Sequence, residues 1–186
     1  MTITTIGIDL AKNVFAVHGV DQNGKTVLVK SRVTRAALPG LIASLPPCVI
    51  GMEACSGAYY WARLFLQYGH EPRLMAAKFV SPYRMAGKSG KNDAADAQAI
   101  CEAVRRPHMR FVPVKDESQQ AMQCLHRNRQ GFIEEKTATY NRLRGLISEF
   151  GVIAPQSTDA LRHMVSAQKS SLPLQVQQCV DDLLEH

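Results

Sequence analysis

The chain has no apolar run long enough to cross a bilayer. Its longest apolar stretch, around residues 38–52, is interrupted by Pro39, Pro46 and Pro47, whereas a membrane-spanning helix needs about 20 apolar residues in succession. No secretory signal is visible either, because Asp9 and Lys12 fall inside the N-terminal segment and no small-residue cleavage pattern follows them. We therefore expect no membrane partner for this chain.

Cysteine pairs with the spacing of a metal or redox site are also missing. The 5 cysteines and 6 histidines are scattered, with no Cys-x-x-Cys pair and no interval typical of structural zinc. Hydrophobic residues make up 46% and charged residues 20% of the 186 residues, which is typical of a folded globular chain and excludes a disordered one. We expect a reduced, cytoplasmic compartment, with the cysteines as small core residues.

Acidic residues are scarce in the N-terminal part. Residues 1–115 contain 15 Lys and Arg against 7 Asp and Glu, whereas residues 116–186 contain 7 against 9. A basic surface of this kind favours a polyanion, and nucleic acid is the usual one, although a merely solvated basic surface gives the same count. The residues predicted to contact nucleic acid are Lys12, Arg84, Lys88, Lys91, Arg105 and Arg106.

The order of elements predicted for the N-terminal part is that of an α/β protein. Residues 2–9, 14–20 and 26–33 are rich in β-branched residues and predict three strands, with Asn23-Gly24 as the hairpin turn between the last two. Helix 34–45, strand 48–53, helix 57–68, strand 72–75 and helix 92–106 follow. This succession is typical of a ribonuclease-H-like fold with a mixed sheet and flanking helices.

Four acids fall at matched places in this pattern. Asp9 ends the first predicted strand and Glu53 ends the fourth, so adjacent parallel strands would bring both carboxylates to one edge of the sheet. Asp93 and Asp96 are three residues apart and share a helix face. Taken singly, an acid at a strand end is more often a surface residue or a helix cap, and a favourable charge near a helix N-terminus would by itself account for Asp93.

Together the four carboxylates predict a metal site. Converging carboxylates repel one another unless cations lie between them. Oxygen-only ligands favour Mg²⁺, with Mn²⁺ as a substitute, and two such ions about 4 Å apart clamp the attacking and leaving oxygens of a phosphodiester. We predict that Asp9, Glu53, Asp93 and Asp96 are both the metal ligands and the catalytic residues.

The C-terminal part has a helical pattern. Apolar residues recur at steps of three and four across residues 117–150, which predicts a helix about 50 Å long with a wide apolar stripe. Return helices are predicted at residues 157–169 and 174–184. The stripe either folds back on these helices or forms a coiled coil with a second chain, and we favour a homodimer. The expected domains are residues 1–115 and 116–186.

Three motifs carry a resemblance to a known family: Gly7-Ile8-Asp9-Leu10-Ala11-Lys12, Met52-Glu53-Ala54-Cys55-Ser56-Gly57 and Lys91-Asn92-Asp93-Ala94-Ala95-Asp96-Ala97. With them the chain resembles the DEDD-type insertion-sequence transposases related to the Piv DNA invertase, over about residues 3–155. The resemblance implies a RuvC-like ribonuclease-H fold, Mg²⁺ bound by the four acids, and recombination of DNA guided by a structured RNA in the bacterial or archaeal nucleoid.

Family members also carry a second, C-terminal transposase domain with a serine nucleophile. We therefore expect this chain to be an N-terminal part, and we assign no serine of it to that role. The alternatives are a Holliday-junction resolvase, a non-catalytic nucleic-acid-binding module, and a sugar-kinase-like phosphotransferase. The last of these needs Gly and Thr after the leading Asp, whereas Leu10, Ala11 and Lys12 follow Asp9 here.

Overall fold

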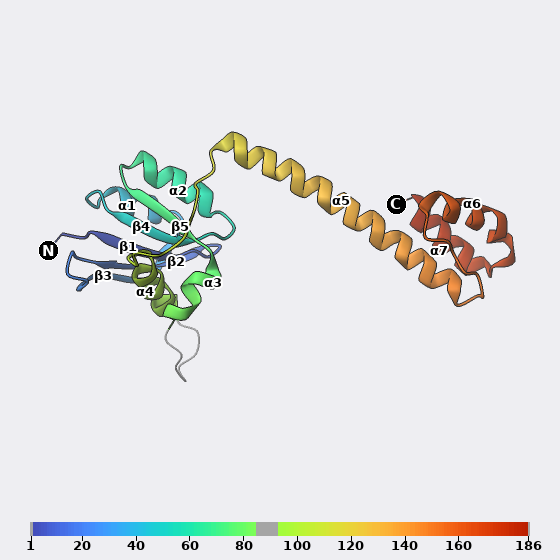
Figure 1. Cartoon of the computed structure of the whole chain (residues 1–186), viewed down its shortest axis with the longest axis horizontal. Helices are drawn as coiled ribbons and strands as arrows, with labels where there is room; N and C mark the ends of the chain where they lie inside the picture. The colour runs from blue at the N-terminus through green and yellow to red at the C-terminus, as the bar shows by residue number, and fades with distance from the viewer. Residues whose placement is uncertain (1, 85–92, 186) are drawn as a thin grey trace. The chain divides into compact units, whose positions relative to one another are not determined.

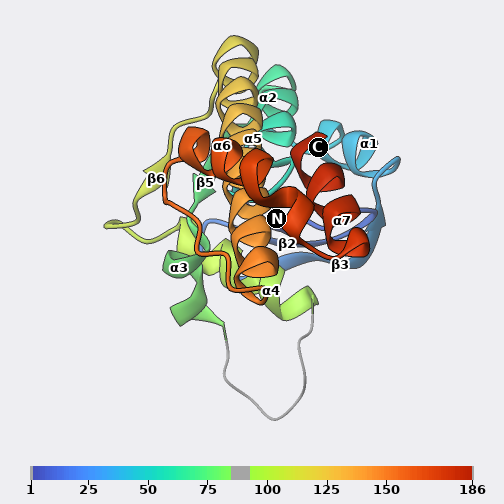
Figure 2. The ribbon, with the colours of Figure 1, turned by 90° about the vertical axis from the view of Figure 1, so that its right-hand side faces the viewer.

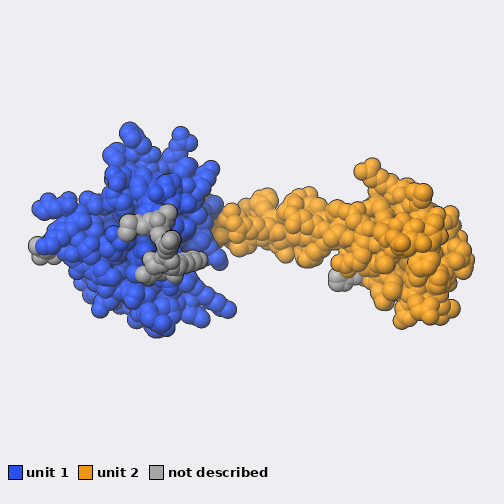
Figure 3. Space-filling view, turned by 90° about the horizontal axis from the view of Figure 1, so that it is seen from below, with its two compact units in different colours: residues 1–117 blue, residues 118–186 orange. Residues whose placement is uncertain are grey.

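The computed structural model describes residues 2–84 and 93–185 (Figure 1). The chain divides into two compact units, residues 1–117 and residues 118–186 (Figure 3). Each unit has its own hydrophobic core, and the first unit holds the carboxylates that the sequence singled out.

The first unit is built on one mixed sheet of six strands. They are β1 (Thr5–Asp9), β2 (Val14–Val20), β3 (Thr26–Thr34), β4 (Val49–Glu53), β5 (Glu71–Met75) and β6 (Phe111–Val112), in the spatial order β3-β2-β1-β4-β5-β6. β1, β2 and β3 form an antiparallel meander, β4 and β5 run parallel to β1, and β6 is antiparallel to β5. The predicted ribonuclease-H-like fold is thereby confirmed.

Helices cover both faces of this sheet. They are α1 (Leu38–Ala43), α2 (Ala58–Gln67), α3 (Ala77–Val80), the 3₁₀ helix η1 (Ser81–Tyr83) and α4 (Asp93–Val104). α1 and α2 lie on one face and α4 on the other (Figure 1, Figure 2). Successive side chains of a strand point to opposite faces of the sheet. Ile6 and Ile8 therefore pack with Trp61 and Phe65 in one core, whereas Gly7, between them, faces α4.

One local prediction for this unit was wrong, and one short strand was not predicted. The helix predicted from residue 34 begins at Leu38, because Thr34 ends β3 and its hydroxyl accepts a hydrogen bond from the Ala37 N–H in a turn. The short strand β6 was not predicted, since two residues between prolines carry no periodic signal.

The second unit consists of helices. α5 (Glu117–Ser148) is the predicted long helix, and α6 (Thr158–Gln168), the 3₁₀ helix η2 (Lys169–Ser171) and α7 (Leu174–Glu185) follow it. Gly151, at a φ of 77°, allows the chain to turn back after α5. Arg144 fixes this return, because its guanidinium donates hydrogen bonds to the carbonyl oxygens of Pro155 and Gln156.

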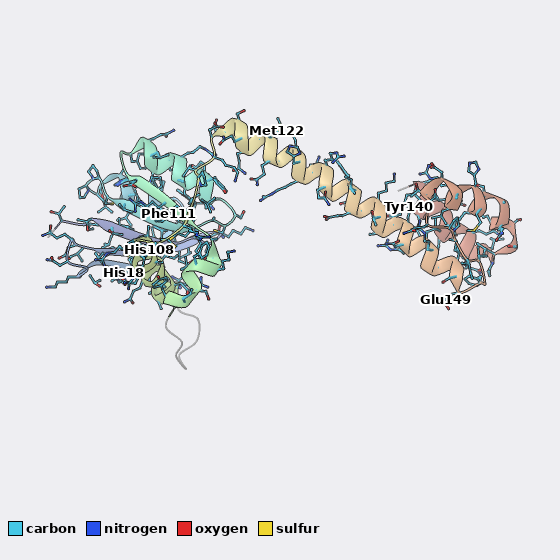
Figure 4. All side chains as sticks on the ribbon, in the orientation of Figure 1. His18, His108, Phe111, Met122, Tyr140 and Glu149 are labelled. Atoms are coloured by element: carbon cyan, nitrogen blue, oxygen red, sulfur yellow. The ribbon has the colours of Figure 1, made fainter. Side chains whose placement is uncertain are left out.

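The apolar stripe of α5 has two different fates. Its C-terminal residues Tyr140, Leu143 and Ile147 are buried against α6 and α7, and Figure 4 labels Tyr140 in this region. Leu125 and Phe132, nearer the N-terminus of the helix, are 64% and 62% exposed. Folding back against α6 and α7 therefore accounts for one end of the stripe only.

None of the described helices is long and apolar enough to span a membrane.

Candidate metal centre

The ends of two neighbouring parallel strands place the first two acids. β1 and β4 pair in register, with Gly7 opposite Gly51 and Ile8 opposite Met52. Asp9 and Glu53 follow one step further and end their strands. Because side chains alternate along a strand, both acids share the sheet face of the two glycines, and this is the face that α4 covers.

The same two glycines allow α4 to approach closely. A Cβ atom on Gly7 would lie 2.3 Å from the carbonyl oxygen of Ala97 and 2.4 Å from the amide nitrogen of Cys101. A Cβ atom on Gly51 would lie 2.8 Å from the Cβ of Val104. The backbone of α4 thus rests directly on the sheet, which brings its first turn, with Asp93 and Asp96, to the end of β1.

Three of the four predicted carboxylates converge. Asp9, Asp93 and Asp96 each offer a carboxylate oxygen, and these atoms lie within 4.8 Å of one another. Asp96 is buried, Asp9 half-buried and Asp93 exposed, so the cluster opens to solvent on one side. Glu53 lies outside this group of three, although its charge acts on Asp9.

An arginine links Glu53 to the cluster. Nη2 of Arg84 donates to Oε1 of Glu53 at 2.9 Å, and Nε of Arg84 lies 2.9 Å from Oδ1 of Asp96. Arg84 follows η1, whose last residue is Tyr83. The sequence predicted that Arg84 contacts nucleic acid, whereas here its guanidinium bridges two of the carboxylates.

The site carries more negative charge than Arg84 balances. Burial, and after it the charges of Asp96, Asp93 and Glu53, together raise the pKa of Asp9 from 3.8 to about 6, although Arg84 acts to lower it. Neighbouring carboxylates disfavour the ionised form of such a carboxyl group, and a bound cation stabilises that form. The donor set contains only carboxylate oxygens, which suits a hard divalent cation such as Mg²⁺ or Mn²⁺.

The remaining predicted basic residues lie in different places. Lys12 is exposed in the segment after Asp9, and its carbonyl oxygen accepts a hydrogen bond from Nε of Arg35 at 2.9 Å. Arg105 and Arg106 pair with Glu102 at the far end of α4, about 18 Å along the helix from Asp93. Lys88 and Lys91 lie outside the described residues.

Sequence reasoning missed the supporting residues of this site. The signal for Gly7 and Gly51 was present, because each strand ends in a glycine, an apolar residue and an acid. Arg35, whose guanidinium carbon lies 5.3 Å from the Trp61 ring centroid, holds the backbone after Asp9 and had no local signal.

Replacing Arg84 by Gln is expected to tighten Mn²⁺ binding roughly tenfold, which is about 1.4 kcal/mol for a partly exposed charge interaction. The variant removes a cation that holds Glu53 and Asp96. Isothermal titration calorimetry measures the affinity. Arg73→Gln is the matched control, because Arg73 pairs with Glu71 at an exposed site. An unchanged or weaker affinity of the Arg84 variant would show that Arg84 does not compete with the metal.

Comparison with known proteins gives consistent matches. A family model described as transposase, of the DEDD type named after insertion sequence IS110, matches residues 6–151. The chain is 49% identical over 154 residues to a probable family 20 transposase of Pseudomonas aeruginosa, covering 83% of the chain and 44% of the relative. It is 38% identical over 185 residues to the transposase for insertion sequence element IS1328 of Yersinia enterocolitica, covering 99% of the chain and 54% of the relative.

A third relative is the transposase for insertion sequence element IS1111A of Coxiella burnetii, 42% identical over 150 residues. The match covers 81% of the chain and 40% of that relative. The chain thus spans about half the length, or less, of these three relatives.

Proposed function

This chain belongs to the IS110-type DEDD transposase family, and we propose that it is the RuvC-like part of a transposase that cleaves and exchanges DNA strands with the help of Mg²⁺. The convergence of Asp9, Asp93 and Asp96 in a unit whose sequence has an excess of basic residues carries the proposal. Mg²⁺ or Mn²⁺ bound there would stabilise negative charge on the phosphodiester and activate the attacking oxygen.

The chain's own residues have separate tasks in this proposal. Asp9, Glu53, Asp93 and Asp96 hold the cation, with Asp96 fixed by its burial on α4 and Asp9 by its place at the end of β1. Arg84 balances the acids in the metal-free protein. Lys12, which is exposed and follows Asp9 by three residues, contacts the nucleic-acid backbone in this proposal.

The partners proposed are DNA and a structured guide RNA. The excess of basic over acidic residues in residues 1–115 supports binding to a polyanion. In this proposal residues 1–115 form the RuvC-like domain and residues 116–186 a helical domain. The matched segment covers 44% and 54% of the first two relatives, and we propose that the whole transposase also has the C-terminal domain that the resemblance implies. A non-catalytic nucleic-acid-binding module is the second candidate, because Arg84 already forms ion pairs with two of the acids.

An excision assay distinguishes the catalytic function from the non-catalytic one. In a longer transposase that contains this segment, Asp96→Asn is expected to lower the frequency of element excision at least a thousandfold, because a metal ligand is lost. Quantitative PCR of the excision junction measures the frequency. Glu102→Gln changes the same charge on the same helix, outside the cluster, and should leave excision within a few-fold of the parent. Excision that survives Asp96→Asn would favour the non-catalytic module.

Self-association is a further part of the proposal. Leu125 and Phe132 are exposed and seven residues apart on α5, so they lie on one side of the helix and suit a coiled-coil contact with a second copy. Leu125→Asp with Phe132→Asp is expected to convert a dimer into a monomer, because two charges would enter the apolar contact. Sedimentation equilibrium at tens of micromolar measures the mass.

The matched control for this variant is Arg127→Gln with Gln130→Glu. It lowers the net charge by the same amount on the opposite side of α5 and should leave the dimer intact. A wild-type chain that sediments as a monomer would contradict the dimer.

A further inference from the structure

A groove of about 410 Å³ lies on the first unit, on the side of α3 and η1. Residues of α3 and η1 form one wall, and the turn that follows α4 forms the other. Figure 4 labels His108 in this turn. The volume lies in the range of about 300–1,000 Å³ that small-molecule sites occupy.

The walls of the groove are firmly placed. Pro107 follows α4, and the Met109 N–H donates to the carbonyl oxygen of Arg106, which turns the chain back toward β6. Tyr83 and Met109 pack against the core that Val80 and Ile100 form beneath α4. The floor of the groove is therefore apolar and anchored in the fold.

The charged side chains among the described residues that line the groove are all basic. Its ionisable lining consists of Lys78, Tyr83, Arg106, His108 and Arg110, without a carboxylate. Arg106 pairs with Glu102 and its guanidinium carbon lies 5.5 Å from the Tyr83 ring centroid. Within the described parts of the chain, Lys78 and Arg110 form no ion pair. The positive charge of the rim is thus available to an anion.

Two aromatic side chains contribute to the same groove. Phe79 and Tyr83 are both partly exposed, and Nζ of Lys78 lies 5.1 Å from the Phe79 ring centroid. Aromatic rings bordered by cations are the elements with which proteins bind single-stranded nucleic acid, because bases stack on the rings while phosphates meet the cations. A base inside a duplex hides its faces, so this groove suits an unpaired base better.

We propose that the groove binds an unpaired nucleotide of a DNA or RNA strand, with the base on Phe79 and Tyr83 and the adjoining phosphates at Lys78 and Arg110. This inference rests on the proposed function, because it specifies where the proposed RuvC-like domain binds a nucleic-acid strand. Tyr83 immediately precedes Arg84, whose guanidinium contacts Glu53 and Asp96. One wall of the groove is thus joined in sequence to the arginine that bridges the carboxylates, whereas the other wall follows the C-terminal end of α4.

The test uses the whole chain in EDTA, with fluorescence anisotropy of labelled (dT)12 and (rU)12. Tyr83→Leu is expected to weaken binding about tenfold, because one stacked base loses its ring, whereas Tyr83→Phe keeps the ring and should bind like the wild type. Circular dichroism melting checks that both variants fold. On a strand with abasic sites, Tyr83→Leu should have no effect.

The charged rim is tested by the dependence of affinity on salt. Lys78→Gln with Arg110→Gln should flatten the slope of log K against log salt by about 1.4, since a single strand contributes about 0.7 for each phosphate contact. Lys25→Gln with Lys30→Gln, at exposed positions of the β2–β3 hairpin region, is the matched control and should leave the slope unchanged.

Two results would overturn the proposal that the groove binds an unpaired nucleotide. One is wild-type affinity of Tyr83→Leu for both (dT)12 and (rU)12, and the other is an equal loss on normal and abasic strands. Binding of either strand that depends on Tyr83 supports the proposal, and the tighter strand identifies DNA or RNA as the source. Because EDTA removes divalent ions, these results are independent of the metal centre and of the transposition test.

Discussion

Asp9→Asn is expected to raise the melting temperature of the metal-free first unit and to abolish its response to Mn²⁺. The pKa of Asp9 is raised to about 6 by burial and by neighbouring acids, so its ionised form destabilises the fold. The native state binds this proton more tightly than the unfolded state, so stability falls as the pH rises from about 4 to 6. Above that pH window the Asp9→Asn variant, whose amide is never charged, should have a higher melting temperature than the wild-type protein.

The wild-type protein, unlike Asp9→Asn, should gain stability when Mn²⁺ is added. At an ion concentration of about 100 times Kd, binding stabilises the fold by about 2.7 kcal/mol, which is a rise of about 5–10 °C for a chain of this length. Differential scanning calorimetry at pH 8 measures both effects. Glu71→Gln, an exposed acid at the start of β5, is the control and should keep the full metal response. A complete Mn²⁺ shift in Asp9→Asn would contradict the assignment of Asp9 as a ligand.

Gly7→Ala is expected to destabilise the first unit by about 1–3 kcal/mol or more, the cost of an additional methyl group in a closely packed core. The new Cβ would lie 2.3 Å from the Ala97 carbonyl oxygen and 2.4 Å from the Cys101 amide nitrogen, and both atoms belong to the backbone of α4. The helix must therefore move away from β1, which separates Asp93 and Asp96 from Asp9. Metal binding should weaken together with stability.

Gly40→Ala provides the comparison for this substitution. Gly40 lies inside α1, and an added Cβ would have no atom within 4 Å. Alanine is favoured over glycine in a helix by about 0.5–1 kcal/mol, so this variant should be at least as stable as the wild type and bind Mn²⁺ normally. Urea unfolding followed by circular dichroism measures both variants. Equal stability of Gly7→Ala and the wild type would contradict the close contact between α4 and the sheet.

The sequence was sufficient to predict the elements that hold Asp9 and Glu53. Strands rich in β-branched residues and an Asn-Gly turn specify the meander locally, and an acid at each strand end follows from reading along the chain. Asp93 and Asp96 could be paired by their helical spacing. Each of these signals lies within a few residues of sequence.

Contacts between distant segments could not be predicted in the same way. The pairing of Arg84 with Glu53 and Asp96 depends on where η1 delivers the arginine, and that is a property of the folded sheet. The division of the α5 stripe into a buried and an exposed part depends on how far back α6 and α7 reach. Periodicity marks a residue as apolar but does not specify which surface covers it.

The proposed function depends on the carboxylates at the ends of β1 and β4 and on α4 forming one divalent-cation site. Electron paramagnetic resonance of Mn²⁺, titrated into the whole chain, counts bound ions directly, because bound Mn²⁺ loses the sharp six-line spectrum of the free ion. We expect at least one bound ion per wild-type chain and none at this site in Asp9→Asn or Asp96→Asn. A wild-type chain that binds no Mn²⁺, or variants that bind as many ions as the wild type, would contradict it.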